Sequence, residues 1–200
     1  MKVEFLKNEQ NNYIKVNNHL LTSPYSPKDE INRFLKQINF KLRNSTIIIF
    51  GLGTGQYLKD ISMLIHKSNS IIVIEPEQEL IENYLLNKKN NMFENIHIIN
   101  STADELIKFL ENNNLNSRFK VVYCYMNYRN IYVELYKQII TSVRNDSILK
   151  LTNEATTKHF EKEFTKNIFV NYIFNEFDIA INALKNKYKN IPALIVSGGP

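Results

Sequence analysis

The sequence predicts a three-layer α/β fold built on a parallel sheet. Four apolar runs of strand length, at residues 46–50, 70–74, 96–99 and 119–125, alternate with segments whose apolar residues recur every three or four positions. Successive runs are joined by connections of about a dozen residues or more, which suits a crossover helix between parallel strands. The alternation favours a sheet with helices on both faces, preceded by an N-terminal hairpin and followed by a C-terminal helical segment.

Length and composition fit one domain, or one domain and the edge of another. The chain has 200 residues, of which 44% are hydrophobic and 22% are charged, so it carries ample apolar material for a core. The formal net charge of +5 is compatible with anionic partners. Because the lysines are scattered and form no basic stripe, we do not expect nucleic acid to be the main partner.

The cysteine count and the hydropathy of the sequence indicate the cellular compartment of the protein. Cys124 is the one cysteine of the chain and cannot form an internal disulfide, which fits a reducing compartment. Its apolar surroundings in the sequence predict a buried strand residue and not a nucleophile. No apolar run reaches the roughly 18 residues of a membrane helix, and the chain does not open on a secretory signal. We therefore expect a cytoplasmic protein without a membrane partner.

Residues 1–44 are predicted to form a hairpin and a helix. Two short strand-like runs, at residues 3–6 and 13–16, are separated by a polar stretch. A helix is then expected to begin at Pro27, with Ser26 as its N-cap. Apolar residues at helical spacing follow, so we interpret this helix as a packing element that covers a sheet edge.

Residues 45–150 are predicted to hold the parallel sheet, and its first unit carries the candidate binding site. Gly51, Leu52, Gly53 and Gly55 follow the first strand, and Glu75 ends the second. Glycine permits positive φ and close approach of a ligand, and the next helix offers free N–H groups. A carboxylate at the end of the adjacent strand can accept hydrogen bonds from both ribose hydroxyls. These five residues are therefore predicted to hold a nucleotide or a related cofactor.

The G-x-G-x-G spacing resembles the first motif of class I S-adenosylmethionine-dependent methyltransferases, which have a Rossmann-like fold. The resemblance implies S-adenosylmethionine as the cofactor and places Asp104, just past the third strand, near its adenine. Two positions depart from the family pattern. The acidic residue expected two positions before the first glycine is Ile49 here, and the fourth strand is followed by Asn127 and Tyr128 without the prolines of the usual Asn-Pro-Pro-Tyr motif.

The other elements follow from local signals. Helices are expected after Gly55, from Pro76, from a cap at Ser101 or Thr102, and over about residues 131–143. The fourth strand, residues 119–125, is apolar apart from Lys120, which is typical of a parallel strand covered on both faces.

The sequence predicts neither a metal site nor a catalytic residue. It has no Cys/His cluster and no nucleophile–base pair at a recognisable spacing. The tyrosines between residues 123 and 136 are expected to pack on strands and helices, with a partly wet rim.

The pattern changes after residue 150. Residues 151–190 are predicted to form a helical linker whose aromatic stripe faces a core or a neighbouring domain. Residues 191–200 are predicted to form a strand and a second glycine turn, the beginning of another α/β domain whose remainder is absent from this chain.

Several motifs together resemble the motility accessory factor family, also called 6-hydroxymethylpterin pyrophosphokinase-like. They are Ser-Pro-Tyr-Ser-Pro-Lys-Asp-Glu, Phe-Gly-Leu-Gly-Thr-Gly, Ile-Glu-Pro and the terminal Pro-Ala-Leu-Ile-Val-Ser-Gly-Gly-Pro, and they span the whole chain. The resemblance implies a bacterial protein that takes part in flagellin glycosylation with nonulosonic, sialic-acid-like sugars. It also implies partners, namely the remainder of its own chain with a central domain, flagellin and a nucleotide sugar. Ser197, Gly198, Gly199 and Pro200 would form the first edge of the nucleotide-sugar site of the central domain.

Three functional hypotheses follow. The first, which we favour, is a Rossmann-like accessory domain of a glycosylating enzyme that is not catalytic by itself. The second is an active methyltransferase that holds its cofactor with the glycine loop and Glu75. The third is an interaction domain that binds a partner or forms a homo-oligomer through the aromatic helices after residue 153.

Overall fold

The computed structural model describes residues 2–8, 11–87, 95–115, 117 and 119–175. The chain divides into two units, Met1–Thr152 and Asn153–Pro200. The predicted strand and turn at residues 191–200, including Ser197, Gly198, Gly199 and Pro200, lie outside the described residues, as does the end of the predicted linker.

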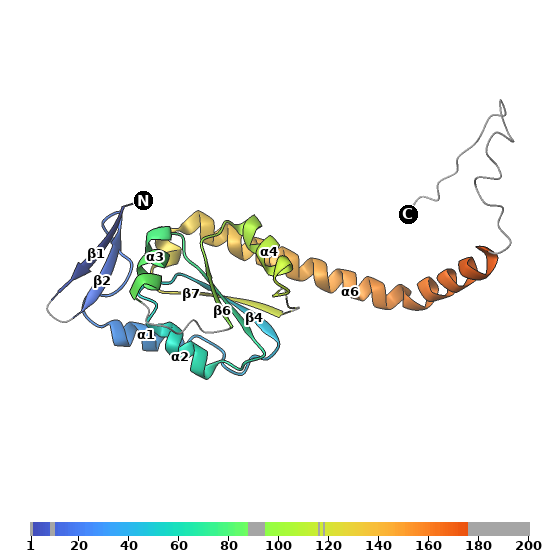
Figure 1. Ribbon diagram of the computed structural model, residues 1–200, viewed down its shortest axis with the longest axis horizontal. Helices are drawn as coiled ribbons and strands as arrows, with labels where there is room; N and C mark the ends of the chain where they lie inside the picture. Colours follow the sequence, from blue (N-terminus) through green and yellow to red (C-terminus); the bar gives the residue numbers. More distant parts are fainter. Residues whose placement is uncertain (1, 9–10, 88–94, 116, 118, 176–200) are drawn as a thin grey trace, which may run out of the picture. The chain divides into compact units, whose positions relative to one another are not determined.

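A four-stranded parallel sheet forms the centre of the first unit. Its strands are β4 (Ser45–Phe50), β5 (Ser70–Ile74), β6 (Ile96–Ile99) and β7 (Phe119–Cys124), in the order β6-β5-β4-β7. Crossovers run through α2 (Tyr57–Leu64), α3 (Gln78–Asn87) and α4 (Ala103–Asn112). Figure 1 shows α1 and α2 on one side of the sheet and α4 and the beginning of α6 on the other. This is the predicted three-layer α/β, Rossmann-like fold.

The central strands are apolar because both of their faces are covered. Every residue of β4 is buried, and in β5 only Ser70 is partly exposed. Residues 119–125 are less fully covered than predicted, because Phe119 is exposed and the other residues of β7 are half-buried, although Tyr125 is buried. β7 is the last strand of the described sheet, and it pairs with β4 on one side.

A buried ion pair ties β7 to the helix that follows it. Lys120 Nζ lies 2.6 Å from the Asp146 carboxylate, and the Lys120 side chain is fully buried. The ammonium group also donates to the backbone oxygen of Ser117 at 2.8 Å. Removing either partner would leave the other charge buried and uncompensated, which is strongly destabilising.

The predicted hairpin is confirmed and is part of a small antiparallel sheet. Its strands are β1 (Val3–Lys7), β2 (Asn12–Val16) and the short β3 (His19–Leu20). The helix α1 (Pro27–Leu35) begins at the expected proline. Ser26 occupies the N-cap position, but its side chain makes no capping hydrogen bond. Instead, the Glu30 carboxylate accepts from the Ser23 N–H at 2.6 Å.

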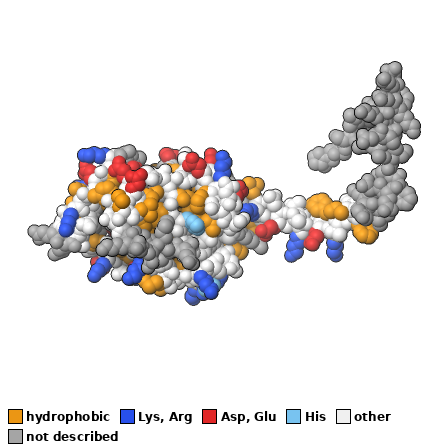
Figure 2. All heavy atoms as spheres, in the orientation of Figure 1, with side chains coloured by type: hydrophobic (Ala, Val, Ile, Leu, Met, Phe, Trp, Pro, Cys, Tyr) orange, Lys and Arg blue, Asp and Glu red, His pale blue; other side chains and the backbone are white. Residues whose placement is uncertain are grey.

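Two helices follow β7, but their bounds differ from the prediction. The sequence analysis expected one helix over about residues 131–143 and a separate helical linker over residues 151–190. α5 (Tyr128–Ile131) is a single turn, and α6 (Val133–Asn175) continues through the expected boundary at residue 150. Among the described residues, the stripe on α6 includes exposed apolar side chains, namely Phe160, Phe164, Ile168 and Phe169. Figure 2 shows apolar side chains at the surface along this helix. Within the described ranges, no helix is both long and apolar enough to cross a membrane.

Candidate functional site

The predicted glycine loop adopts the backbone conformation that its sequence requires. Gly51, Gly53 and Gly55 have φ angles of 109°, 56° and 70°, values that strain residues with a Cβ atom. A tyrosine ring packs against each of these glycines. A Cβ on Gly51 would come within 2.4 Å of the Tyr128 ring, and one on Gly53 within 2.6 Å of the Tyr125 ring. Tyrosine rings of the chain itself therefore occupy the space beside the glycines that a Cβ atom would fill.

Glu75 lies at the end of β5, where the sequence places it, but its carboxylate is fully buried. Its Oε2 accepts from the Leu52 N–H at 2.8 Å and from the Tyr128 hydroxyl at 2.6 Å. Its Oε1 accepts from the Glu77 N–H at 3.0 Å. Both oxygens that would accept from a ribose are already bonded within the protein.

Tyr128 completes the arrangement. Its hydroxyl accepts from the Gly53 N–H at 2.7 Å while it donates to Glu75. The residues Gly51, Leu52, Gly53, Glu75 and Tyr128 are all buried, and we call them the closed glycine site. The Leu52 amide and the Tyr128 hydroxyl donate to the carboxylate, and the Gly53 amide donates to that hydroxyl, so these buried polar groups are all hydrogen-bonded.

The electrostatics of the closed glycine site follow from burial. Burial raises the pKa of Glu75 to about 7, and the hydrogen bonds from Tyr128, Glu77 and Leu52 oppose that rise. Burial, with the neighbouring Glu75 carboxylate, also raises the pKa of Tyr128 well above its usual value. The tyrosine therefore stays protonated and acts as a hydrogen-bond donor.

An aromatic cluster surrounds the closed glycine site. The Tyr57 hydroxyl donates to the Gly51 carbonyl at 2.6 Å, and the Tyr57 ring stacks on Tyr125 with centroids 4.8 Å apart. The Tyr132 ring stacks on Tyr128 at 5.7 Å. The sequence analysis predicted packing tyrosines here, and Tyr125, Tyr128 and Tyr132 are buried. It did not predict that these rings would cover the glycines.

Asp104 is not brought together with the glycine loop. It is exposed at the beginning of α4 and borders a separate cavity of about 450 Å³, which Lys137 and Gln138 of α6 also line. Its predicted contact with an adenine stays a prediction. Asn100, which the sequence analysis did not consider, lies closer to the site, because its Nδ2 donates to the backbone oxygen of Glu75 at 2.9 Å.

Cys124 has no reactive environment. Its thiol is half-buried, and burial raises its pKa to about 11. The thiolate is therefore scarce at neutral pH, which supports a packing role. In the described part of the chain, no group of three or more His, Cys, Asp or Glu side chains is arranged to hold a metal ion.

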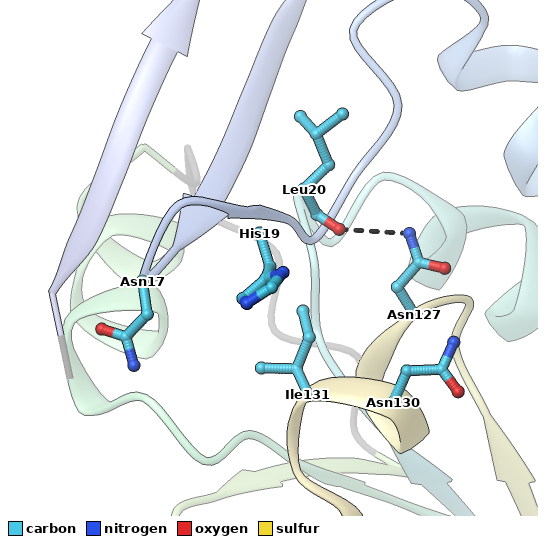
Figure 3. A pocket seen from close by; sticks show the side chains of 6 residues that line it. All are labelled: Asn17, His19, Leu20, Asn127, Asn130 and Ile131. Atoms are coloured by element: carbon cyan, nitrogen blue, oxygen red, sulfur yellow. Dashed lines mark hydrogen bonds between the residues drawn. The ribbon is translucent and has the colours of Figure 1, made fainter.

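A cavity of about 500 Å³ lies near the carboxyl end of β7, and Figure 3 shows the residues that line it. Asn17, His19 and Leu20 come from the β2–β3 region, and Asn127, Asn130 and Ile131 come from the α5 region. Asn127 Nδ2 donates to the Leu20 carbonyl at 3.1 Å (Figure 3). The asparagine that partly matches the methyltransferase motif therefore serves here to fasten the N-terminal sheet.

A second, larger cavity of about 640 Å³ borders the outer half of the glycine loop. It extends between the β1–β2 hairpin, residues Gly53–Gln56 and α3. Glu75 does not line it. The open space beside the loop therefore lies on the hairpin side, away from the carboxylate that the sequence analysis assigned to a ribose.

No family model and no curated protein matches the sequence. Two solved methyltransferase structures resemble parts of the chain. An S-adenosylmethionine-dependent methyltransferase from Aquifex aeolicus is 24% identical with a TM-score of 0.29, over 36% of this chain and 38% of that one. A protein-L-isoaspartate O-methyltransferase is 12% identical with a TM-score of 0.33, over 50% of this chain and 28% of that one. This chain thus spans well under half the length of either structure.

Proposed function

We propose that residues 1–152 form a Rossmann-like domain that is not catalytic by itself and in which the glycine loop and Glu75 act as core structure. The observation that carries this proposal is the hydrogen bond from Tyr128 to Glu75 inside the closed glycine site, 2.6 Å long. A cofactor ribose would need the two carboxylate oxygens that Leu52, Glu77 and Tyr128 already engage. Displacing these donors without an equivalent replacement would leave buried groups unsatisfied.

A second observation supports the proposal, at the position that would hold the methionine end of S-adenosylmethionine. The residue two before the first glycine is Ile49, which is fully buried in β4. An isoleucine offers no charge to the ammonium group of the cofactor, so a charge-assisted hydrogen bond is missing. This supports a domain that does not use that cofactor.

We place this domain in a larger protein of the motility accessory factor type that takes part in the transfer of a nonulosonic sugar to flagellin. The sequence motifs at both ends of the chain support this assignment. The nucleotide sugar would then bind to the central domain, of which Ser197, Gly198, Gly199 and Pro200 would form one edge under this proposal. Flagellin from cells that lack this protein should lose the mass of the sugar, and an unchanged flagellin mass would contradict the assignment.

Calorimetric titration of the chain with S-adenosylhomocysteine tests the closed glycine site. We expect no binding up to millimolar ligand, because both oxygens of Glu75 already accept hydrogen bonds inside the buried site. Stoichiometric binding that Glu75→Gln abolishes would contradict the proposal. A cytidine-monophosphate sugar, titrated in parallel, should also fail to bind at this site.

A methyltransferase is the second candidate, and the strand order β6-β5-β4-β7 with a carboxylate at the end of β5 favours it. This function would require the Tyr128 side chain to leave Gly51 and Glu75. The variant Tyr128→Ala removes the obstructing ring and hydroxyl. If this variant binds S-adenosylhomocysteine while the parent chain does not, the methyltransferase architecture is latent and is blocked by Tyr128. Methyl transfer by the parent chain would favour the methyltransferase over the accessory domain.

A further inference from the structure

The cavity of about 640 Å³ between the hairpin and α3, called the groove below, is lined by aromatic, amide and cationic side chains. Its volume falls within the range of small-molecule sites, about 300–1,000 Å³. Figure 1 shows the β1–β2 hairpin beside α3, at the end of the sheet where the glycine loop lies. The groove is thus part of the first unit and is separate from the closed glycine site.

The hairpin provides an aromatic ring and a cation on the same face. Residues directly opposite each other in an antiparallel pair share a face, and here Phe5 pairs with Ile14 and Lys7 with Asn12. Ile14 is buried in the core, whereas Phe5, its cross-strand neighbour, is 47% exposed. Phe5 and Lys7 therefore lie on the hairpin face that packs on the core. Both residues line the groove.

The opposite wall is aromatic and amide-rich. Tyr84 of α3 packs its ring against Gly55, where a Cβ atom would come within 2.4 Å of it. Asn83 and Gln56 lie beside it. Lys7 is the one charged side chain among the described residues that line the groove, and none of those lining residues is acidic. The groove therefore favours a ligand with negative charge and a flat apolar ring.

We propose that this groove binds a small molecule that joins an aromatic ring to a phosphate group. The ring lies between Phe5 and Tyr84, and the phosphate meets the Lys7 ammonium. The amides of Asn83 and Gln56 bond polar edges of the ligand. This site goes beyond the proposed function, because it uses the outer half of the glycine loop and neither Glu75 nor Tyr128.

Titration of the complete chain with adenosine monophosphate, followed by ligand-observed NMR, tests the proposal. We expect saturable binding in the millimolar range or below. Lys7→Gln should weaken it about tenfold, as expected for loss of one charge-assisted hydrogen bond. Lys15→Gln is the matched control, because Lys15 pairs with Glu4 on the other face of the same hairpin, and it should leave binding unchanged.

Two further probes separate ring recognition from phosphate recognition. Adenosine, which lacks the phosphate, and ribose 5-phosphate, which lacks the ring, should each bind more weakly than adenosine monophosphate by about tenfold. Phe5→Leu keeps an apolar strand residue and should weaken adenosine monophosphate but not ribose 5-phosphate. Circular dichroism checks that each variant is folded.

Failure of adenosine monophosphate to bind would overturn the proposal, as would equal effects of Lys7→Gln and Lys15→Gln. Equal binding of adenosine and adenosine monophosphate would overturn the phosphate assignment. None of these outcomes would test the proposed role of the closed glycine site. Conversely, S-adenosylhomocysteine binding that depends on Glu75 would overturn the proposed function without bearing on Lys7.

Discussion

Replacing Tyr128 with phenylalanine removes one hydroxyl group from the centre of the closed glycine site and leaves the ring in place on Gly51. Two buried hydrogen bonds disappear, the donation to Glu75 at 2.6 Å and the acceptance from Gly53 at 2.7 Å. A hydrogen bond to a charged group contributes about 1.5–3 kcal/mol, and a buried N–H left unsatisfied costs about 1–3 kcal/mol. Because one hydroxyl serves both bonds, we expect the free energy of unfolding to fall by about 3 kcal/mol.

Urea unfolding followed by circular dichroism measures this loss, in mildly alkaline buffer where Glu75 is ionised. The matched control is Tyr132→Phe, which removes a hydroxyl that donates to the half-buried Glu77 at 2.9 Å. We expect the control to lose about 1 kcal/mol. If Tyr128→Phe is as stable as the parent chain, or if both variants lose the same amount, the closed glycine site does not stabilise the domain as described.

Three further predictions concern Glu75, Gly53 and the helix cap at Thr102. Burial raises the pKa of Glu75 from 4.5 to about 7, so between these values the folded chain holds a proton that the unfolded chain has lost. The free energy of unfolding should therefore fall by about 3 kcal/mol as pH rises through this window, and urea titrations should show that Glu75→Gln removes this slope. Gly53→Ala should lose about 3 kcal/mol in urea unfolding, because its φ is positive and its new methyl group meets the Tyr125 ring; a loss below about 1 kcal/mol would contradict this packing. Thr102→Ala should lose about 1 kcal/mol, because the Thr102 side chain accepts from the Glu105 N–H in a capping box; an unchanged thermal midpoint would contradict that role.

The local signals of the sequence predicted the elements of the fold well. The apolar runs identified the four strands of the parallel sheet, and Thr102, one of the two residues expected as the cap, is the N-cap of α4. Positive φ at Gly51 and Gly53 is a conformation that glycine adopts without strain. The position of Glu75 follows from the length of β5. Each of these inferences uses neighbours in the chain, so no knowledge of the tertiary packing was required.

The closure of the glycine loop depends on contacts between distant segments. Tyr128 lies 75 positions from Gly53 and 53 positions from Glu75 along the chain. The sequence pattern does not show which ring covers which glycine. The available signal was the tyrosine-rich segment directly after β7, since β7 pairs with β4 and brings that segment to the loop.

The sequence analysis did not predict that β7 is the last strand of the described sheet or that α6 is so long, and the two reasons differ. An apolar run such as residues 119–125 occurs both in central strands and in edge strands that a helix partly covers, so pattern alone does not separate them. α6 was divided because its apolar pattern changes near residue 150. The stronger signal was the lack of any glycine or proline from Val133 to Asn175, since these residues are the usual helix breakers.

Amide hydrogen exchange of the parent chain, read residue by residue by NMR, tests the closed glycine site most directly. The Leu52 and Gly53 amides donate to Glu75 and Tyr128 inside a buried cluster, and we predict that both exchange only as the domain unfolds. Their exchange should stay unchanged when S-adenosylhomocysteine is added. Rapid exchange of both amides in the free protein, together with protection by this ligand, would show an open cofactor site and contradict the account.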